Sequence, residues 1–427
     1  MVKRSILRIA IGTLITFSFL VTMSALVHAE RDTTYRVISL YDLTGPYAGL
    51  HQLNSRGEVD FWRWANNEPG YLPEGVKIKD EIYDHGMDMG RAVAAYHMAV
   101  SSTPRPILTT GGQTSPTILA IKSIAKREKI PCVDGASARS IMVPPAWTFS
   151  MQGCYEGMVA AAGRLLRDNW RSDTPYTLIR KRYEENKNRN PRMSIIGWDN
   201  AFGRGFDQKE GRDYLKSIGV DWVESEYVPL NPTDTTPQIL RLVKGGVDMI
   251  FFGLFAESHA FILKDAARMG VREKFQDMCF WADNIIQLKN YAGKLAEGTL
   301  MITGYQMTFE EWPEWLLKNL ERSGLGENGA LSYSGVASWF DVDCEAIRRA
   351  AKKVGPENIT GQDIYDALIS MKDYQCMAYN SKITFNETRR IGPSTAAVYQ
   401  IQNGKVVKVE KSVYIPDLLP NGKDVVR

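Results

Sequence analysis

The chain has 427 residues, 44% of them hydrophobic and 24% charged, which is enough for two globular units rather than one. Its 52 basic and 49 acidic residues nearly cancel, which argues against nucleic-acid binding and against strong adhesion to membrane surfaces. The five cysteines lack zinc-binding spacing, and their odd number leaves at least one thiol free or bonded to another molecule.

The first 29 residues predict a secretory signal peptide. Lys3, Arg4 and Arg8 precede a long apolar run that ends in Val-x-Ala, which places cleavage after Ala29. The alternative is an uncleaved membrane anchor, but the small-residue ending and the polar sequence that follows favour cleavage. We therefore expect an exported, soluble mature chain.

Strand-like and helix-like segments alternate at the start of the mature chain. We expect strands at 35–41, 78–83, 106–110 and 130–134, and helices at 58–67, 89–100 and 118–128. This alternation predicts a parallel sheet with helices on both faces.

The most informative stretch is TTGGQTSPTILA at 109–120, which joins the third strand to its helix. Ser115 before Pro116 predicts an N-cap followed by proline at the first helical position. Gly111 and Gly112 allow close approach to the backbone, and a helix N-terminus attracts an anion. Because no P-loop lysine follows, we expect a carboxylate there rather than a phosphate. The alternative is an ordinary strand-to-helix turn.

The alternation then restarts as a second doubly wound unit. We expect helices at 157–169, 207–218, 237–244 and 257–269, and strands at 193–198, 221–228, 249–252 and 278–281.

Residues 171–192 stand apart because they are rich in basic side chains. We expect a solvated loop on the second unit, and the alternative is a docking surface for a membrane partner. The basic residues are Arg180, Lys181, Arg182, Lys187, Arg189 and Arg192.

The last quarter departs from simple alternation. We expect strands at 298–303, 382–385, 396–401 and 406–414, and helices at 312–322, 334–353 and 360–371. Thr360 predicts the cap of the last helix, and Asn403-Gly404 predicts a hairpin turn. A third block after two units indicates that the chain returns to complete the first unit, so that several crossings join the two.

Five stretches, in this order, resemble the type I periplasmic solute-binding proteins of the leucine/isoleucine/valine class. The family's opening strand, TGP turn and helix resemble VISLYDLTGPYAGLHQLNSRGEVDFWRWANN, and its second strand and Ala-rich helix resemble IKDEIYDHGMDMGRAVAAYHMAV. IPCVDGASARS resembles the Ala/Ser loop that follows the carboxylate-binding helix, and IIGWDNAFGRGF resembles the second-lobe strand with its aromatic-Gly pair. YAGKLAEGTLMITGY resembles the crossover into the third block. The likeness covers essentially the whole mature chain.

The resemblance implies an α/β fold of two doubly wound parallel-sheet lobes joined by three hinge crossings, near Phe149, near 303–304 and near Val398. Residues 30–149 and 304–397 would form the N-terminal lobe, and residues 150–303 and 398–427 the C-terminal lobe. The implied protein is a monomeric periplasmic receptor that closes on a small ligand and delivers it to an ABC permease of the inner membrane. It implies no cofactor, no metal and no nucleic acid.

The resemblance also implies where a ligand carboxylate binds. By position, Ser115 and the backbone at Gly112 and Gln113 would hold it, and Ala136 and Ser137 would add backbone groups from the same lobe. The alternative for Ser115 is a helix cap and nothing more.

The rest of the implied site is aromatic. Tyr47 would lie beside the ligand, and Phe202, Phe255 and Trp281 would line the cleft from the second lobe. The alternative for the last three is that they are core aromatics. These aromatics indicate an apolar ligand body, such as a branched-chain, phenyl or other hydrophobic carboxylate.

Two departures from the family bear on the ligand. The family's loop threonine corresponds to Ala138, and its ammonium-binding acid falls nearest Trp281. Since a buried ammonium needs an anionic partner, an α-amino acid would require Asp283 or Glu257 to replace that acid. The alternative for Asp283 is an N-cap.

Two other functions compete with transport. A ligand sensor of the same fold, feeding a receptor or regulator, is the first. An exported hydrolase is the second, but the nearest match to a G-x-S-x-G elbow, YSGVAS, lacks the pattern, and the five histidines show no ligand spacing.

Overall fold

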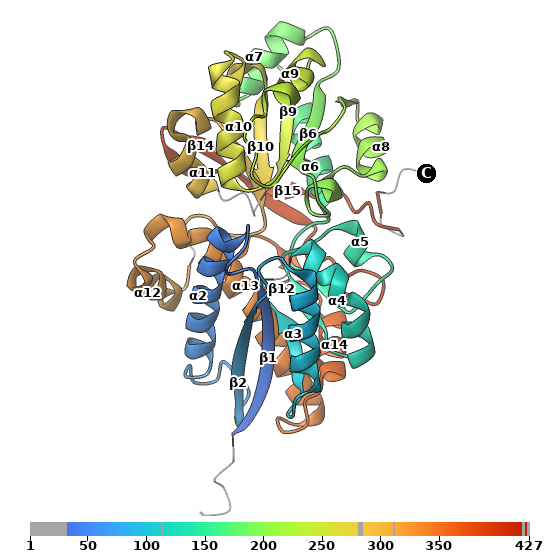
Figure 1. The fold of residues 1–427 in the computed structure, drawn as a ribbon, viewed down its shortest axis with the longest axis vertical. Helices are drawn as coiled ribbons and strands as arrows, with labels where there is room; N and C mark the ends of the chain where they lie inside the picture. The colour runs from blue at the N-terminus through green and yellow to red at the C-terminus, as the bar shows by residue number, and fades with distance from the viewer. Residues whose placement is uncertain (1–31, 113, 281–284, 311, 421–422, 425–427) are drawn as a thin grey trace, which may run out of the picture.

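The computed structural model describes residues 32–112, 114–280, 285–310, 312–420 and 423–424, so the expected signal peptide lies outside the described residues. Two lobes, each built on its own sheet, are stacked along the long axis of the molecule (Figure 1). Within these ranges, no helix is both long enough and apolar enough to span a membrane.

The first lobe contains a five-stranded parallel sheet in the order β2-β1-β3-β4-β5. The four expected strands are present, and a fifth follows them, where we expected only a crossing near Phe149. The strands are β1 (Thr33–Tyr41), β2 (Val76–Asp84), β3 (Pro106–Thr110), β4 (Cys132–Asp134) and β5 (Thr148–Ser150). Every residue of β3, β4 and β5 is buried, as a sheet covered on both faces requires.

Helices cover both faces of this sheet, as predicted. On one face, α3 (Met89–Ser101) and α4 (Ser115–Glu128) bury Tyr96 and Ile121 in one cluster with Ile38 of β1. On the other face, α2 (Ala48–Ala65) packs against α13 (Ala330–Val354). A short helix, α5 (Arg139–Met142), follows β4.

The second lobe contains an eight-stranded sheet in the order β15-β14-β11-β10-β9-β6-β7, with β8 also beside β6. Its strands are β6 (Arg192–Trp198), β7 (Asp221–Trp222), β8 (Glu226–Val228), β9 (Met249–Gly253), β10 (Gln276–Phe280), β11 (Leu300–Thr303), β14 (Thr395–Gln402) and β15 (Lys405–Tyr414). The strands from β6 to β11 are parallel, whereas β14 and β15 are antiparallel additions at one edge.

The four helices predicted for the second lobe are present, together with two further helices, at 177–186 and 285–292, that we did not predict. They are α6 (Tyr155–Asp168), α7 (Thr177–Asn186), α8 (Lys209–Ser217), α9 (Thr236–Lys244), α10 (Ala256–Arg268) and α11 (Ile285–Ala292). Short 3-10 turns lie between helices and strands: η1 (Gly203–Phe206) before α8, η2 (Arg272–Lys274) after α10 and η3 (Gly293–Ala296) after α11.

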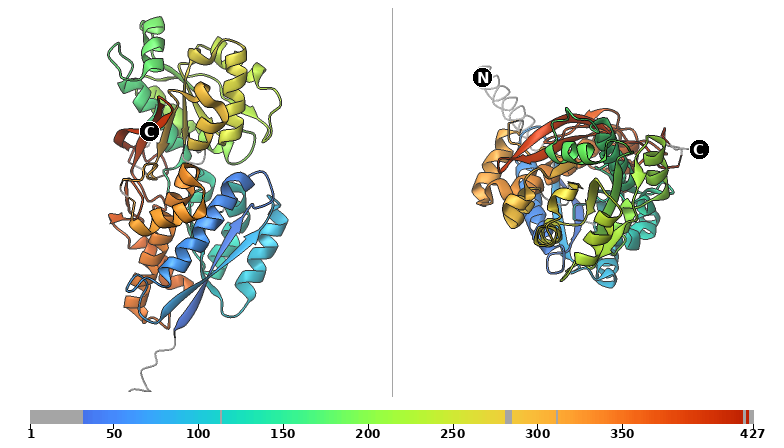
Figure 2. Two further views of the ribbon diagram at one scale, coloured as in Figure 1. Left: turned by 90° about the vertical axis from the view of Figure 1, so that its left-hand side faces the viewer. Right: turned by 90° about the horizontal axis from the view of Figure 1, so that it is seen from above.

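The last block packs against the first lobe. It contains α12 (Glu314–Ser323), η4 (Gly326–Gly329), α13, α14 (Gly361–Ile369) and the two-stranded pair β12 (Tyr374–Gln375) and β13 (Lys382–Ile383). Because α13 packs on α2, β3 and β4, and α14 packs on β3, the chain passes between the two sheets three times: after β5, after β11 and before β14. Figure 2 shows this block and the two edge strands from two further directions.

Two local predictions in this block are confirmed. Thr360 caps α14 in a capping box, with Asp363 accepting from the Thr360 backbone N–H at 3.0 Å. Asn403 and Gly404 have φ of 52° and 72°, which suits the two-residue turn between β14 and β15.

The prediction of a single strand at 221–228 is wrong. The segment forms two short strands, β7 and β8, which both pair with β6. Between them the chain leaves the ladder, and the hydroxyl of Ser194 donates to the carbonyl of Glu224 at 2.9 Å.

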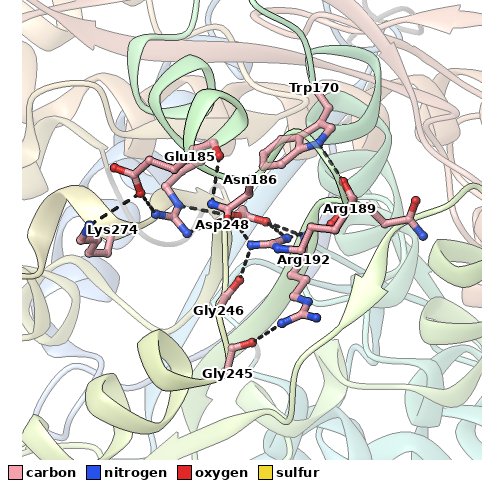
Figure 3. Close-up of polar contacts among 11 residues, drawn as sticks. Trp170, Glu185, Asn186, Arg189, Arg192, Gly245, Gly246, Asp248 and Lys274 are labelled. Atoms are coloured by element: carbon pink, nitrogen blue, oxygen red, sulfur yellow. Dashed lines mark hydrogen bonds and ion pairs between the residues drawn. The ribbon is translucent and has the colours of Figure 1, made fainter.

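The solvated loop expected at 171–192 is also wrong, because the segment contains α7 and ends in β6. The reason is the buried carboxylate of Asp248, which accepts hydrogen bonds from Arg182 at 3.1 Å, from Arg189 at 2.6 Å and from the backbone N–H of Arg192 at 2.9 Å. Figure 3 shows Arg189 and Arg192 around Asp248. Arg182 is itself only 6% exposed. The arginines therefore fasten α7 to the start of β6 and β9.

All five cysteines are buried, as expected for Cys132 and Cys279 from their apolar surroundings. Cys132, Cys154, Cys344 and Cys376 are free thiols.

Candidate functional site: the cleft between the lobes

The glycine turn after β3 has the conformation that the sequence indicated. Gly111 and Gly112 have φ of +65° and +69°, which other residues rarely adopt. A Cβ on Gly112 would lie 2.2 Å from Cδ1 of Tyr41, and one on Gly111 would lie 2.7 Å from the hydroxyl of Tyr41. Only glycine fits at either position.

The expected N-cap is wrong by one residue. Thr114 caps α4, since its hydroxyl accepts from the backbone N–H of Thr117 at 3.2 Å, and Ser115 is the first helical residue. This shift leaves the hydroxyl of Ser115 available for a contact outside its own helix.

Ser115 meets the second lobe directly. Its Oγ lies 3.2 Å from the hydroxyl of Tyr155, the first residue of α6, and both residues are buried. Burial raises the pKa of Tyr155, an effect that the Ser115 hydrogen bond partly offsets, so Tyr155 keeps its proton at neutral pH. Two hydroxyl groups, one from each lobe, therefore meet beside the glycine turn.

The loop after β4 supports this pair. The backbone N–H of Ala136 donates to Asp134 at 2.7 Å, and the hydroxyl of Ser137 donates to the carbonyl of Gly153 at 2.6 Å. The next residue, Ala138, approaches Gly205 of the second lobe, where an added Cβ would lie 3.4 Å from that of Ala138. The small side chain of Ala138 lets the lobes come this close.

Two buried carboxyl groups lie next to the turn. Glu58 accepts from the hydroxyl of Ser39 at 2.6 Å, and Asp343 accepts from the hydroxyl of Thr110 at 2.6 Å. Burial raises the pKa of Glu58 to about 8 and raises that of Asp343 strongly. Glu58 is therefore mostly neutral at pH 7 and adds little repulsion toward an anion at the turn.

Tyr47 forms the first-lobe half of an aromatic cluster. It is 2% exposed, and its ring centroid lies 5.4 Å from that of Trp198 and 4.9 Å from that of Phe255. Its hydroxyl accepts from Nδ2 of Asn200 at 3.2 Å. Burial raises the pKa of Tyr47, so its hydroxyl is also protonated. Tyr47 thus connects the lobes by ring contacts and by a hydrogen bond.

The second-lobe half of the cluster is aromatic throughout. The ring of Phe202 lies 5.7 Å from that of Phe255, 5.4 Å from that of Phe280 and 5.6 Å from that of Tyr155. The indole of Trp198 donates to the hydroxyl of Ser258 at 3.1 Å, which fixes its ring against the cluster. These contacts form an apolar wall beside the two hydroxyls.

Sequence reasoning missed Tyr155, Trp198 and Asn200. Trp198 and Asn200 belong to the same IIGWDNAFGRGF stretch that supplied Phe202, so the signal was present. Tyr155 begins the first helix after the first crossing, where an aromatic residue with a polar tip was the available sign.

Three expected site residues, Gln113, Trp281 and Asp283, lie outside the described residues. Glu257 is exposed at the start of α10 and accepts from the hydroxyl of Tyr291 at 3.3 Å. An added Cβ on Gly49 of the first lobe would lie 3.3 Å from its carboxylate, so Glu257 lies where the lobes approach one another.

The arrangement suits binding rather than bond breaking. It offers hydroxyl donors at one end and aromatic surface at the other, which can orient a carboxylate and cover an apolar body. In the described parts of the chain, no group of three or more His, Cys, Asp or Glu residues is placed to hold a metal ion.

Comparison with known proteins agrees with the two-lobed fold. A family model described as periplasmic binding protein matches residues 34–405. A comparison with curated proteins finds no match.

Solved structures of transport proteins have the same fold. A branched-chain amino acid ABC transporter protein from Thermus thermophilus, with bound valine, is 20% identical with a TM-score of 0.73, over 90% of this chain and 97% of that one. A leucine-binding protein from Thermotoga maritima is 15% identical with a TM-score of 0.68, over 89% and 99%. A fatty acid ABC transporter substrate-binding protein from Thermomonospora curvata is 17% identical with a TM-score of 0.69, over 92% and 95%. Identities this low establish a shared fold but do not identify the ligand of this chain.

Proposed function

Because the chain belongs to the periplasmic binding protein family, we propose that it is the substrate-binding component of an ABC importer. It would act in the periplasm after removal of the signal peptide, as a monomer that docks transiently on an inner-membrane permease. Three of the similar solved structures are ABC transport proteins, which supports this role.

The ligand we propose is a small carboxylate with an apolar body. It is either a hydrophobic amino acid, such as a branched-chain one, or an aromatic or aliphatic acid without an amino group. The observation that carries this proposal is the meeting of the Ser115 and Tyr155 hydroxyls, 3.2 Å apart, beside a glycine turn and against an aromatic wall.

In this proposal the carboxylate enters between Ser115 and Tyr155 and accepts from both hydroxyls. Gly112 and Gln113 would add backbone donors at the turn. Ala136 and Ser137 would shape the first-lobe floor, since the Ala136 N–H is already bonded to Asp134.

The apolar body of the ligand would lie against Tyr47, Phe202, Phe255 and Trp281. Asp283 would face an amino group if the ligand carries one. Residues from both lobes are needed, so binding favours the closed arrangement through contacts that the open one lacks.

A thermal-shift screen tests this proposal. The mature protein is purified through unfolding to strip carried-over ligand, refolded, and mixed with amino acids, aromatic and aliphatic acids, amides and ureas. A ligand at about 100 times its Kd should stabilise the protein by about 2.7 kcal/mol. Hits among carboxylates, lost with their amides, would support the proposal, whereas hits only among uncharged compounds would contradict it.

A sensor role is the second candidate, because the same cleft could report a ligand to a receptor. Reconstitution with the candidate permease separates the two. Ligand uptake that depends on this protein supports import, and binding without uptake favours a sensor.

A further inference from the structure

A cavity of about 660 Å³ lies beside the crossings between the lobes, and it shares no lining residue with the aromatic cluster around Tyr47. Its walls come from the segment after β11, from the loop between β12 and β13, and from β15, which runs along the boundary of the two lobes (Figure 1). The lining residues are Gln306, Trp312, Pro313, Gln375, Cys376, Met377, Ala378, Tyr379, Asn380, Lys408 and Lys411.

The walls belong to different lobes. The backbone N–H of Met377 donates to Asp341 of α13 at 2.8 Å, which fastens the β12–β13 loop to the first lobe. The same loop is tied to the crossing after β11, where the backbone N–H of Gln306 donates to Ala378 at 3.0 Å. Since β15 belongs to the second sheet, an occupant of the cavity would contact both lobes.

Bulges in β15 bring two lysines into the cavity. In a regular strand, residues three apart face opposite sides, so Lys408 and Lys411 would diverge. The register with β14 shifts here. Tyr399 lies opposite Lys408, but its neighbour Val398 lies opposite Glu410, so β15 has one extra residue between the two pairs. The register shifts again between Val398 and Ala396. Lys408 is held in place, since its Nζ donates to Asn380 at 3.0 Å and lies 5.8 Å from the ring centroid of Tyr399.

One lining residue, Trp312, has a buried donor. Trp312 is 6% exposed, and its indole Nε1 has no hydrogen-bond partner in the described part of the chain. No Asp or Glu is among the described lining residues, although the exposed carboxylate of Glu310, outside the lining, is attracted to Lys408. Pro313 and Met377 add apolar surface. Two ammonium groups and this apolar surface, with no acid among the described lining residues, suit an anion with a short carbon chain.

We propose that this hinge cavity is a second ligand site, which binds a small dicarboxylate. The two ammonium groups of Lys408 and Lys411 supply the charge, and the indole of Trp312 supplies a neutral donor. An occupant that contacts both lobes changes the balance between the open and closed states, and this changes the affinity of the cleft for its ligand. By linkage, a cleft ligand changes the affinity of the hinge cavity by the same factor. The site itself does not depend on the proposed transport role.

Calorimetry with succinate on the refolded mature protein tests the site. Succinate should bind with one saturable event, and the double variant K408Q/K411Q should weaken it about tenfold or more. The matched control is K405Q, an exposed lysine of β15 outside the cavity, which should leave the affinity unchanged. W312F keeps an aromatic ring but removes the N–H, and it should also weaken binding.

The outcomes separate this site from the cleft. Saturable succinate binding that survives F202L, which changes the aromatic wall within the second lobe, but falls in K408Q/K411Q, with thermal midpoints like the wild type, would support the proposal. No binding to the wild type, or equal affinity in K408Q/K411Q and the wild type, would overturn it. Binding lost in F202L but kept in K408Q/K411Q would assign succinate to the aromatic wall and would also overturn it.

Discussion

Glu58→Gln should remove most of a pH dependence of stability that originates beneath the glycine turn. Glu58 is fully buried on α2, and its carboxyl group accepts from Ser39 at 2.6 Å. Burial outweighs this hydrogen bond and raises the pKa of Glu58 from 4.5 to about 8.

The direction of the pH dependence of stability follows from which state, folded or unfolded, keeps the proton on Glu58. Between these two pKa values the folded chain keeps a proton on Glu58 that the unfolded chain has lost. The stabilisation is therefore complete below about pH 4.5 and is lost as the pH rises through about 8. The two pKa values differ by about 3.5, which at about 1.4 kcal/mol per pH unit corresponds to about 5 kcal/mol.

Urea unfolding at about pH 4.5 and about pH 8.5 measures this difference. The free energy of unfolding of the wild type should fall by about 5 kcal/mol more than that of E58Q. The control E74Q removes an exposed acid from the loop before β2 and should follow the wild type. Equal pH dependence in the wild type and E58Q would refute the argument that Glu58 is neutral in the folded protein.

Three further substitutions test other parts of the account. Gly112→Ala should destabilise the protein by about 3 kcal/mol, because its Cβ would overlap a ring, whereas Gly324→Ala, with the same sign of φ and open space, should cost about 1 kcal/mol. Asp248→Asn should cost about 3–5 kcal/mol because it leaves the buried Arg182 without this carboxylate, whereas Glu314→Gln at an exposed ion pair should leave the stability nearly unchanged. Tyr47→Phe should open the ligand-free molecule and raise its radius of gyration in X-ray scattering, since one bond between the lobes is lost. Equal stabilities within either matched pair, or an unchanged radius, would contradict the respective contact.

Much of the fold could be predicted from the sequence because its signals are local. Apolar runs between glycine and polar turns located the parallel strands, and the capping pattern at Thr360 located α14. The basic segment could not be predicted in the same way. Arg182 is buried because of Asp248, 66 residues away, and no local pattern reports that partner.

The site was only partly predictable for a similar reason. Thr114 and Ser115 are both good N-caps, and their tertiary contacts decide which of them caps α4 and which faces Tyr155. The pairing of Tyr47 with Asn200 likewise depends on how closely the lobes approach. The candidate roles of Gln113, Trp281 and Asp283 stay predictions.

The most direct test of the account is the affinity of the first carboxylate found in the screen, measured by calorimetry for the wild type and for Ser115→Ala. We expect the variant to bind more weakly by about 1–3 kcal/mol, because a hydrogen bond to a charged group is lost. Tyr155→Phe should weaken binding in the same direction, and Ser55→Ala, at a half-buried serine of α2, should leave it unchanged. Wild-type affinity in both Ser115→Ala and Tyr155→Phe would contradict a carboxylate site between the two hydroxyls.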